Sequence, residues 1–216
     1  MRWLDSSPSR SHCAARSSGE CESAVDRLSP ENRFPAPLED AVASYRWLLR
    51  QGIRPERVIF AGDSAGGGLA LAAMIALRAQ GEALPAAAVC MSPLTDLAHE
   101  GDSMRTRAKL DPLVQLASST AHPHCYVGDL KAPLASPLYA DLRGLPPTLI
   151  LVGTWETLLD DSTRWAERAR AAGCDVSIEL WEEMIHIFSI FADELPETRQ
   201  AIARMGEYIK QKTAAR

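Results

Sequence analysis

The stretch Val58-Ile59-Phe60-Ala61-Gly62-Asp63-Ser64-Ala65-Gly66-Gly67 decides the fold. Its first four residues are apolar and predict a short buried strand, while the Ala-, Leu- and Met-rich sequence from Leu69 to Ala79 predicts a helix. Between them the spacing is G-x-S-x-G, which places a serine at the apex of a sharp strand-to-helix turn. Glycine at both flanks suits such a turn, because a Cβ would clash where the backbones approach closely. This context predicts an exposed, nucleophilic Ser64 rather than a structural glycine-rich turn.

The predicted helix after the turn adds a second feature to this site. Its N-terminus directs unpaired N–H groups and the positive end of the helix dipole toward any anion formed at Ser64. We therefore expect the backbone N–H groups of Ala65 and Gly66, with Gly67 as a further candidate, to form an oxyanion hole.

Composition limits the class of protein. The chain has 216 residues, enough for one domain with a sizeable core. Its net charge of −5 and pI near 5.6 argue against nucleic acid or an anionic membrane as a partner. We expect no membrane span, because no apolar run approaches the roughly 18 residues required, and no signal peptide. Five cysteines without a C-x-x-C pair indicate a reduced, cytoplasmic protein.

The chain divides into two unequal parts. Residues 5–23 carry seven serines and no large aliphatic side chain, so we expect residues 1–24 to form a disordered arm. We expect residues 25–216 to form a single but partial α/β domain. Strands are predicted at 58–61, 86–91, 148–152 and 176–181, and helices at 38–51, 69–79, 158–172 and near the C-terminus. This alternation predicts a mostly parallel sheet covered by helices on both faces, with 92–147 as a long excursion that lines a pocket.

A serine nucleophile needs a base and an acid from later loops, beyond the carboxyl ends of the strands. His186 follows the fourth predicted strand and is the candidate base, although its apolar neighbours also suit a buried structural histidine. Glu156 follows the third strand and is the favoured acid, with Asp160 as the alternative. We expect Glu182 and Glu183 to be solvated. Ser64, Glu156 and His186 are thus the predicted catalytic residues.

The remaining histidines are weaker candidates. His12 falls in the serine-rich arm and His99 in a polar loop, while His122 and His124 belong to His-Pro-His-Cys. That cluster lacks a second set of ligands elsewhere in the chain, so we expect no metal site.

Several further segments carry a resemblance. The chain resembles the hormone-sensitive-lipase-like (family IV) esterases of the α/β-hydrolase fold. The similar segments run in family order from about Val25 to the end: 27–36 with Glu39 and Asp40, 62–67, 92–96 (Ser-Pro-Leu-Thr-Asp), 136–140 (Ser-Pro-Leu-Tyr-Ala), 156–161 and 184–186. The resemblance implies hydrolysis of short-chain carboxylic esters, and of lactones, without a cofactor. Many members have aspartate where this chain has Glu156.

The sequence also departs from that family. No His-Gly-Gly-Gly run precedes Ser64, since Gly19 and Gly52 are the only glycines before the turn that starts at Gly62, and the family's early strands and cap helices are missing. We expect an N-terminally truncated protein whose activity is impaired by loss of an oxyanion donor. We also expect the strand at 58–61 to present an unpaired edge that promotes self-association.

Two other functions remain open from the sequence. One is a catalytically inactive fragment or pseudoenzyme that keeps the triad without the full oxyanion hole. The other is amide hydrolysis or acyl transfer to an alcohol by the same triad, because fold and triad do not set the substrate.

Overall fold

A five-stranded sheet forms the centre of the molecule. The computed structural model describes residues 15–16, 26–115, 123–191 and 194–214. Within them the strand order is β1-β2-β3-β4-β5, and β2 to β5 run parallel. The strands are β1 (Ala15–Arg16), β2 (Val58–Asp63), β3 (Ala87–Met91), β4 (Thr148–Gly153) and β5 (Val176–Trp181). The mostly parallel α/β architecture predicted from the sequence is confirmed.

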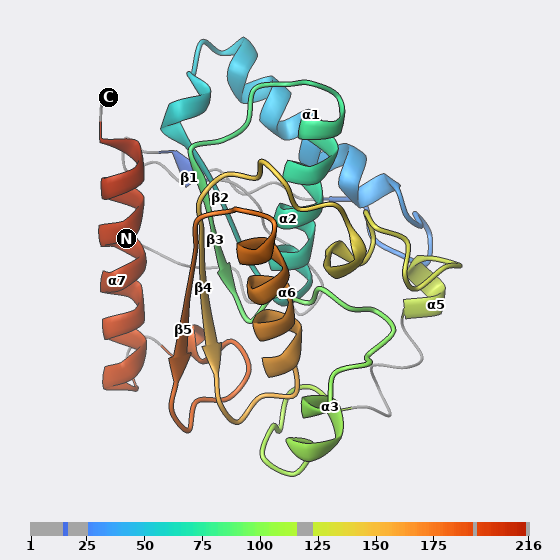
Figure 1. Cartoon of the computed structure of the whole chain (residues 1–216), viewed down its shortest axis with the longest axis vertical. Coiled ribbons are helices and arrows are strands. Elements are labelled where there is room, and N and C mark those ends of the chain that lie inside the picture. The colour runs from blue at the N-terminus through green and yellow to red at the C-terminus, as the bar shows by residue number, and fades with distance from the viewer. Residues whose placement is uncertain (1–14, 17–25, 116–122, 192–193, 215–216) are drawn as a thin grey trace.

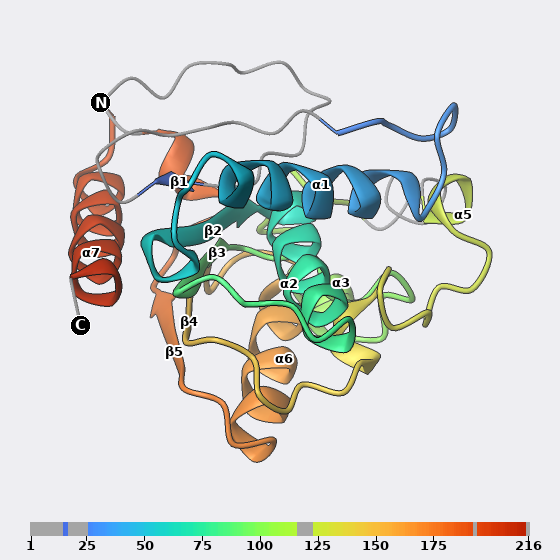
Figure 2. The same cartoon turned by 90° about the horizontal axis from the view of Figure 1, so that it is seen from above.

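Helices cover both faces of this sheet (Figures 1 and 2). On one face lie α2 (Ser64–Ala79) and α6 (Leu159–Ala171), with α1 (Ala36–Arg50) packed on α2; α7 (Pro196–Thr213) covers the other face. The short helices are α3 (Ser103–Thr106), α5 (Pro123–Tyr126), η1 (Pro55–Arg57), η2 (Pro137–Tyr139) and η3 (Phe188–Ile190). Among the described residues, no helix is both long and apolar enough to cross a membrane.

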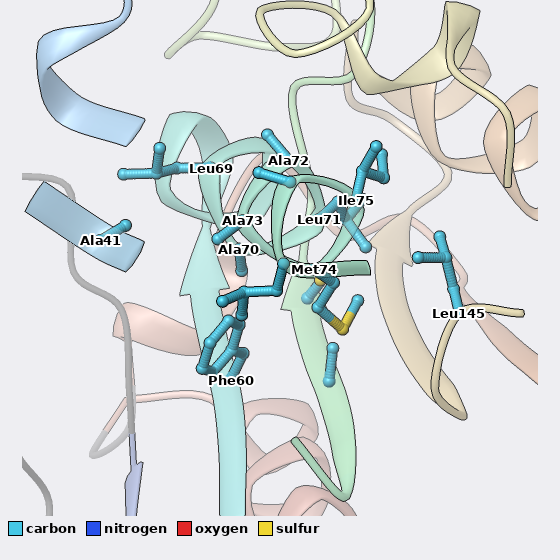
Figure 3. Packing of buried hydrophobic residues seen from close by; sticks show 14 of the residues in the cluster. Ala41, Phe60, Leu69, Ala70, Leu71, Ala72, Ala73, Met74, Ile75 and Leu145 are labelled. Atoms are coloured by element: carbon cyan, nitrogen blue, oxygen red, sulfur yellow. The ribbon is translucent and has the colours of Figure 1, made fainter. Parts of the chain in front are cut away.

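The hydrophobic core has two parts, one on each face of the sheet, because successive side chains of a strand point to opposite faces. Phe60 of β2 and Ile150 of β4 belong to the cluster beneath α2 and α6, whereas their neighbours Ile59 and Leu149 belong to the cluster beneath α7. Figure 3 shows the first cluster, with the small and aliphatic side chains of α2 packed above Phe60. Because both faces are buried, β2, β3 and β4 read as continuous apolar runs rather than as alternating ones.

The predicted elements are present, with shifted ends. The strand predicted at 58–61 continues to Asp63, and the helix predicted to start at Leu69 starts at Ser64. The first turn of α2 was not predicted because it contains three consecutive glycines, 66–68, and glycine has a low helix propensity. Tertiary packing requires glycine at one of them, since a Cβ on Gly68 would collide with the Leu94 carbonyl oxygen. Gly52 and Gly173 follow the ends of α1 and α6 with φ of +82° and +84°, as predicted for helix termination.

The N-terminal arm gives one correction. The predicted disordered stretch, residues 1–24, lies outside the described residues except for Ala15 and Arg16. These two residues form β1, which pairs antiparallel with β2 at Ile59 and Val58. The edge of β2 that was predicted to be unpaired is therefore paired at Val58 and Ile59. The disorder of the arm as a whole stays a prediction. Strand pairing uses backbone groups, so the polar composition of the arm does not prevent it.

Candidate active site

The turn between β2 and α2 holds Ser64 in a strained conformation. Ser64 has φ of +49°, a left-handed value that is uncommon for a residue with a side chain. A Cβ on Gly62 would lie 2.8 Å from the Gly67 nitrogen and still closer to the Gly66 carbonyl, so the turn requires glycine there. The turn projects the half-buried Ser64 beyond the carboxyl end of β2. Strain of this kind is typical of functional sites.

The structure brings the predicted base and acid to Ser64. His186 Nε2 lies 2.9 Å from Ser64 Oγ, and His186 Nδ1 lies 2.9 Å from Glu156 Oε2. His186 and Glu156 are buried, with exposed fractions of 3% and 0%. A base within hydrogen-bond reach of a nucleophile, itself oriented by a carboxylate, is the arrangement that activates a serine.

The alternative acid lies elsewhere. Asp160 Oδ2 accepts a hydrogen bond from the Ser103 backbone N–H (2.9 Å), and the Asp160 N–H donates to Ser103 Oγ (3.0 Å). These bonds join the start of α6 to the start of α3. Glu182 and Glu183 are exposed, as expected for solvated side chains. Of the candidate acids, Glu156 is the one that contacts His186.

Sequence reasoning missed Ser92, which binds the Glu156 carboxylate. Ser92 Oγ donates to the second carboxylate oxygen, Glu156 Oε1 (2.9 Å), and accepts from the Ile187 N–H (3.1 Å). The Gly153 N–H also donates to Glu156 Oε1 (2.5 Å). Ser92 is fully buried and, like Ile187, has φ of +47°. The sequence offers two signals for Ser92: its place directly after β3, at the strand edge where functional residues gather, and its position at the start of the family-like segment 92–96.

The loop after β3 contacts the three segments that carry Ser64, Glu156 and His186. Besides the two bonds of Ser92, the Leu94 N–H donates to the Ser64 carbonyl oxygen (2.9 Å). A Cβ on Gly67 would approach the Pro93 Cβ to 2.9 Å, which shows how tightly this loop packs on the first turn of α2. The relative positions of Ser64, Glu156 and His186 thus depend on residues 92–94.

The predicted oxyanion donors lie at the first turn of α2. Ala65 is exposed and Gly66 is buried. Their N–H groups fall among the first four of the helix, which have no intrahelical acceptor. They are therefore free of helix hydrogen bonding at the position where negative charge would develop.

A pocket of about 410 Å³ opens at Ser64. Its walls are mainly apolar, with polar contributions from Asp26, Ser29, His99 and Tyr126. The excursion over 92–147 supplies much of the wall, as predicted, through Leu94, Leu97, His99, Leu113, Val114, Pro123, Tyr126, Leu134 and Ala135. His99, assigned to a polar loop from the sequence, lines the same pocket as Ser64.

Buried carboxylates fix this excursion to α6. Asp96 forms an ion pair with Arg164 (2.8 Å) and accepts from the Tyr139 hydroxyl (2.9 Å). Asp161 Oδ2 accepts from the Thr95 and Asp96 N–H groups (2.7 and 2.8 Å). Burial raises the pKa of the Asp161 carboxyl to about 7, although these two backbone hydrogen bonds oppose the shift.

Metal ligands are not grouped in the described part of the chain, where no set of three or more His, Cys, Asp or Glu side chains is placed to hold an ion. His12 and His122 lie outside the described residues, and His124 is exposed on α5.

Comparison with known proteins assigns the family. A family model described as alpha/beta hydrolase fold matches residues 8–190. The chain belongs to the α/β-hydrolase family. It is 49% identical over 189 residues to an acetyl-hydrolase of Streptomyces hygroscopicus, covering 87% of this chain and 63% of the relative. It is 39% identical to an esterase of Acinetobacter venetianus, covering 84% and 61%.

The similarity to solved structures points to one branch of this α/β-hydrolase family. An esterase from the bacterial hormone-sensitive lipase family superposes with a TM-score of 0.86 at 52% identity, covering 88% of this chain and 64% of that one. The resemblance stated from the motifs is confirmed. The chain spans less than two thirds of the length of each of these relatives.

Proposed function

We propose that this α/β-hydrolase chain carries the catalytic centre of a serine carboxylesterase acting on short-chain esters. The observation that supports this most strongly is the continuous hydrogen-bonded series from Ser64 through His186 to Glu156. Relatives named acetyl-hydrolase, esterase and carboxylesterase support the same class of reaction.

In this proposal each residue has a role that the distances support. Ser64 Oγ attacks the ester carbonyl carbon while His186 Nε2 takes the hydroxyl proton. The carbonyl oxygen becomes an oxyanion that accepts hydrogen bonds from the Ala65 and Gly66 N–H groups. The tetrahedral intermediate collapses, His186 returns the proton to the leaving alcohol, and an acyl-serine remains. Water, deprotonated by His186, then hydrolyses the acyl-serine, while Glu156 holds the imidazole through Nδ1.

The pocket supports small, apolar acyl or alcohol groups. A volume of about 410 Å³ accommodates a short-chain ester beside Ser64, and leucine side chains dominate its walls. A lactone is a cyclic ester that presents the same carbonyl to Ser64, so lactones belong to the proposed substrate class.

Turnover is proposed to be impaired. The sequence has no glycine-rich run before Ser64 that could add oxyanion donors to those of α2. Loss of one such donor lowers turnover by about 10²- to 10³-fold in comparable hydrolases. We therefore expect slow turnover relative to an esterase of the family that has the glycine-rich loop.

Self-association through the sheet edge is part of the proposal. Within the described residues, β1 pairs with β2 only at Val58 and Ile59, so Phe60 to Asp63 have a strand partner on the β3 side alone. Exposed strand edges pair with other chains. Size-exclusion chromatography with light scattering measures this directly, and a monomer at all concentrations would contradict it.

The test of the activity is hydrolysis of p-nitrophenyl butyrate by the purified chain, with Ser64→Ala measured in parallel. We expect slow turnover that Ser64→Ala abolishes. Labelling of Ser64 by a fluorophosphonate, followed by intact mass, reports an activated serine without a full catalytic cycle. A chain that neither turns over the ester nor takes the label is not an esterase, and equal turnover by Ser64→Ala would exclude Ser64 as the nucleophile.

A further inference from the structure

Asp111 is a buried carboxylate outside the proposed triad, and it is hydrogen-bonded to the residue that follows Glu156. Asp111 has an exposed fraction of 1%. Its Oδ2 accepts from the Thr157 N–H (2.8 Å) and lies 3.1 Å from the Thr157 hydroxyl. Thr157 directly follows Glu156 and is itself fully buried. One oxygen of Asp111 is therefore bonded to the loop that carries the acid.

The other oxygen of Asp111 holds a different part of the site. Oδ1 accepts from the Leu113 N–H (2.9 Å) and the Val114 N–H (3.2 Å). Leu113 and Val114 line the pocket that opens at Ser64. The Thr157 hydroxyl also lies 3.2 Å from the Val114 carbonyl oxygen, which gives a second link between the same two segments.

We propose that Asp111 is a positioning residue that fixes the acid loop and the pocket wall as one unit. The inference rests on the proposed esterase function. A buried carboxylate is unfavourable unless its oxygens are fully hydrogen-bonded, and here the backbone donors of both segments satisfy it. Oδ2 binds the segment of Thr157, and Oδ1 binds the segment of Leu113 and Val114. A shift of either segment would therefore leave buried hydrogen-bonding groups without partners. Asp111 touches no reacting atom and acts through Glu156 and the substrate-facing wall.

This arrangement predicts a separation of kinetic effects. A shift of the acid loop misorients His186 and lowers kcat, since misplacement of about 1 Å costs up to roughly 10²-fold. A shift of Leu113 and Val114 changes substrate fit, and so alters KM and the preference for acyl length.

The first test changes the Thr157 side chain with little change in its size. Thr157→Val removes the hydroxyl group and keeps the shape of the side chain, whereas Thr157→Ser keeps the hydroxyl group. We expect kcat for p-nitrophenyl butyrate to fall about tenfold in Thr157→Val, with Thr157→Ser within about twofold of the original chain. Thr148→Val is the matched control, because Thr148 is equally buried and its hydroxyl donates to the Pro146 carbonyl at the far end of β4. We expect Thr148→Val to keep its kcat.

The second variant is Asp111→Asn. Its side-chain NH₂ group must face either the Thr157 N–H or the N–H groups of Leu113 and Val114, and it can accept a hydrogen bond from neither. We expect a lower kcat together with a changed ratio of kcat/KM between p-nitrophenyl butyrate and octanoate. The inference is overturned if Thr157→Val and Asp111→Asn lose only thermal stability, while kcat and the acyl-length ratio stay at the values of Thr148→Val. If Asp111→Asn does not fold, the Thr157 pair decides the inference.

Failure of the proposed function gives a different pattern. In that case the unaltered chain shows no Ser64-dependent hydrolysis and no fluorophosphonate labelling, and the positioning role is overturned with it. If the unaltered chain labels without turning over the ester, the labelling rate replaces kcat in the same comparison of variants.

Discussion

Gly153→Ala is the sharpest perturbation that the structure offers. Gly153 ends β4, and its N–H donates to Glu156 Oε1. A Cβ at this position would lie 2.5 Å from the Met184 carbonyl carbon and closer still to its oxygen. The added methyl group would therefore act as a wedge between the loop that carries Glu156 and the loop that carries His186.

The size of the effect follows from that contact. Carbon atoms pack at about 3.5–4.0 Å, so the Met184 segment must move by about 1 Å. Movement on this scale breaks the hydrogen bond from the Trp155 N–H to the Met184 oxygen (3.1 Å), and His186 lies two residues further on. We expect kcat to fall about 10²-fold. Overpacking of this kind also costs about 1–3 kcal/mol of stability.

The assay compares Gly153→Ala with Gly206→Ala. A Cβ on Gly206 of α7 meets nothing within 4 Å, so this control should gain about 0.5–1 kcal/mol from reduced chain entropy and keep its activity. Ester hydrolysis and thermal melting are measured on both variants and on the unaltered chain. A Gly153→Ala variant with unchanged kcat would refute the steric reasoning, because the two loops would then tolerate a separation of about 1 Å.

Three further predictions concern buried groups. Ser92→Ala removes the donor to Glu156 and the acceptor of the Ile187 N–H, so we expect about a tenfold lower kcat in the same ester assay; an unchanged kcat would count against the role of residues 92–94. The raised pKa of Asp161, about 7 against 3.8, means that the folded state holds a proton which the unfolded chain releases, so stability falls as pH rises from about 4 to 7. Asp161→Asn should flatten that dependence in urea titrations at pH 5 and pH 8, and an unchanged slope would contradict the pKa shift. Trp165 is fully buried, and its indole N–H has no hydrogen-bond partner among the described residues; Trp165→Ala should cost about 3–5 kcal/mol and Trp165→Phe far less. Equal melting temperatures of the two Trp165 variants would show that the cavity is not the cause.

The sequence predicted those parts of the site whose signals are local. The strand, glycine turn and helix around Ser64 occupy consecutive residues, and each has its own compositional pattern. His186 and Glu156 could be proposed because parallel strands place the loops that follow them at one edge of the sheet. The choice of Glu156 over Asp160 was only a preference from the sequence, because both follow the same strand.

The remaining parts depend on contacts between distant residues. Ser92 and Glu156 are 64 residues apart, and Asp111 and Thr157 are 46 apart. A serine or an aspartate in a polar loop has no periodicity that would mark it as buried beside a catalytic acid. The pairing of Ala15 and Arg16 with β2 was missed for a related reason, since hydrogen bonds between strands do not depend on side-chain type.

The hydrogen bond between Ser64 and His186 joins residues that are 122 positions apart. Between them the chain must complete β3, β4, α6 and β5, so no early local structure can contain both groups. Chain closure over such a distance is slow and entropically costly before the intervening sheet has formed. During refolding, Ser64 should therefore become reactive later than the helical circular-dichroism signal returns. The rate at which Ser64 reactivity returns would then report the last step of folding.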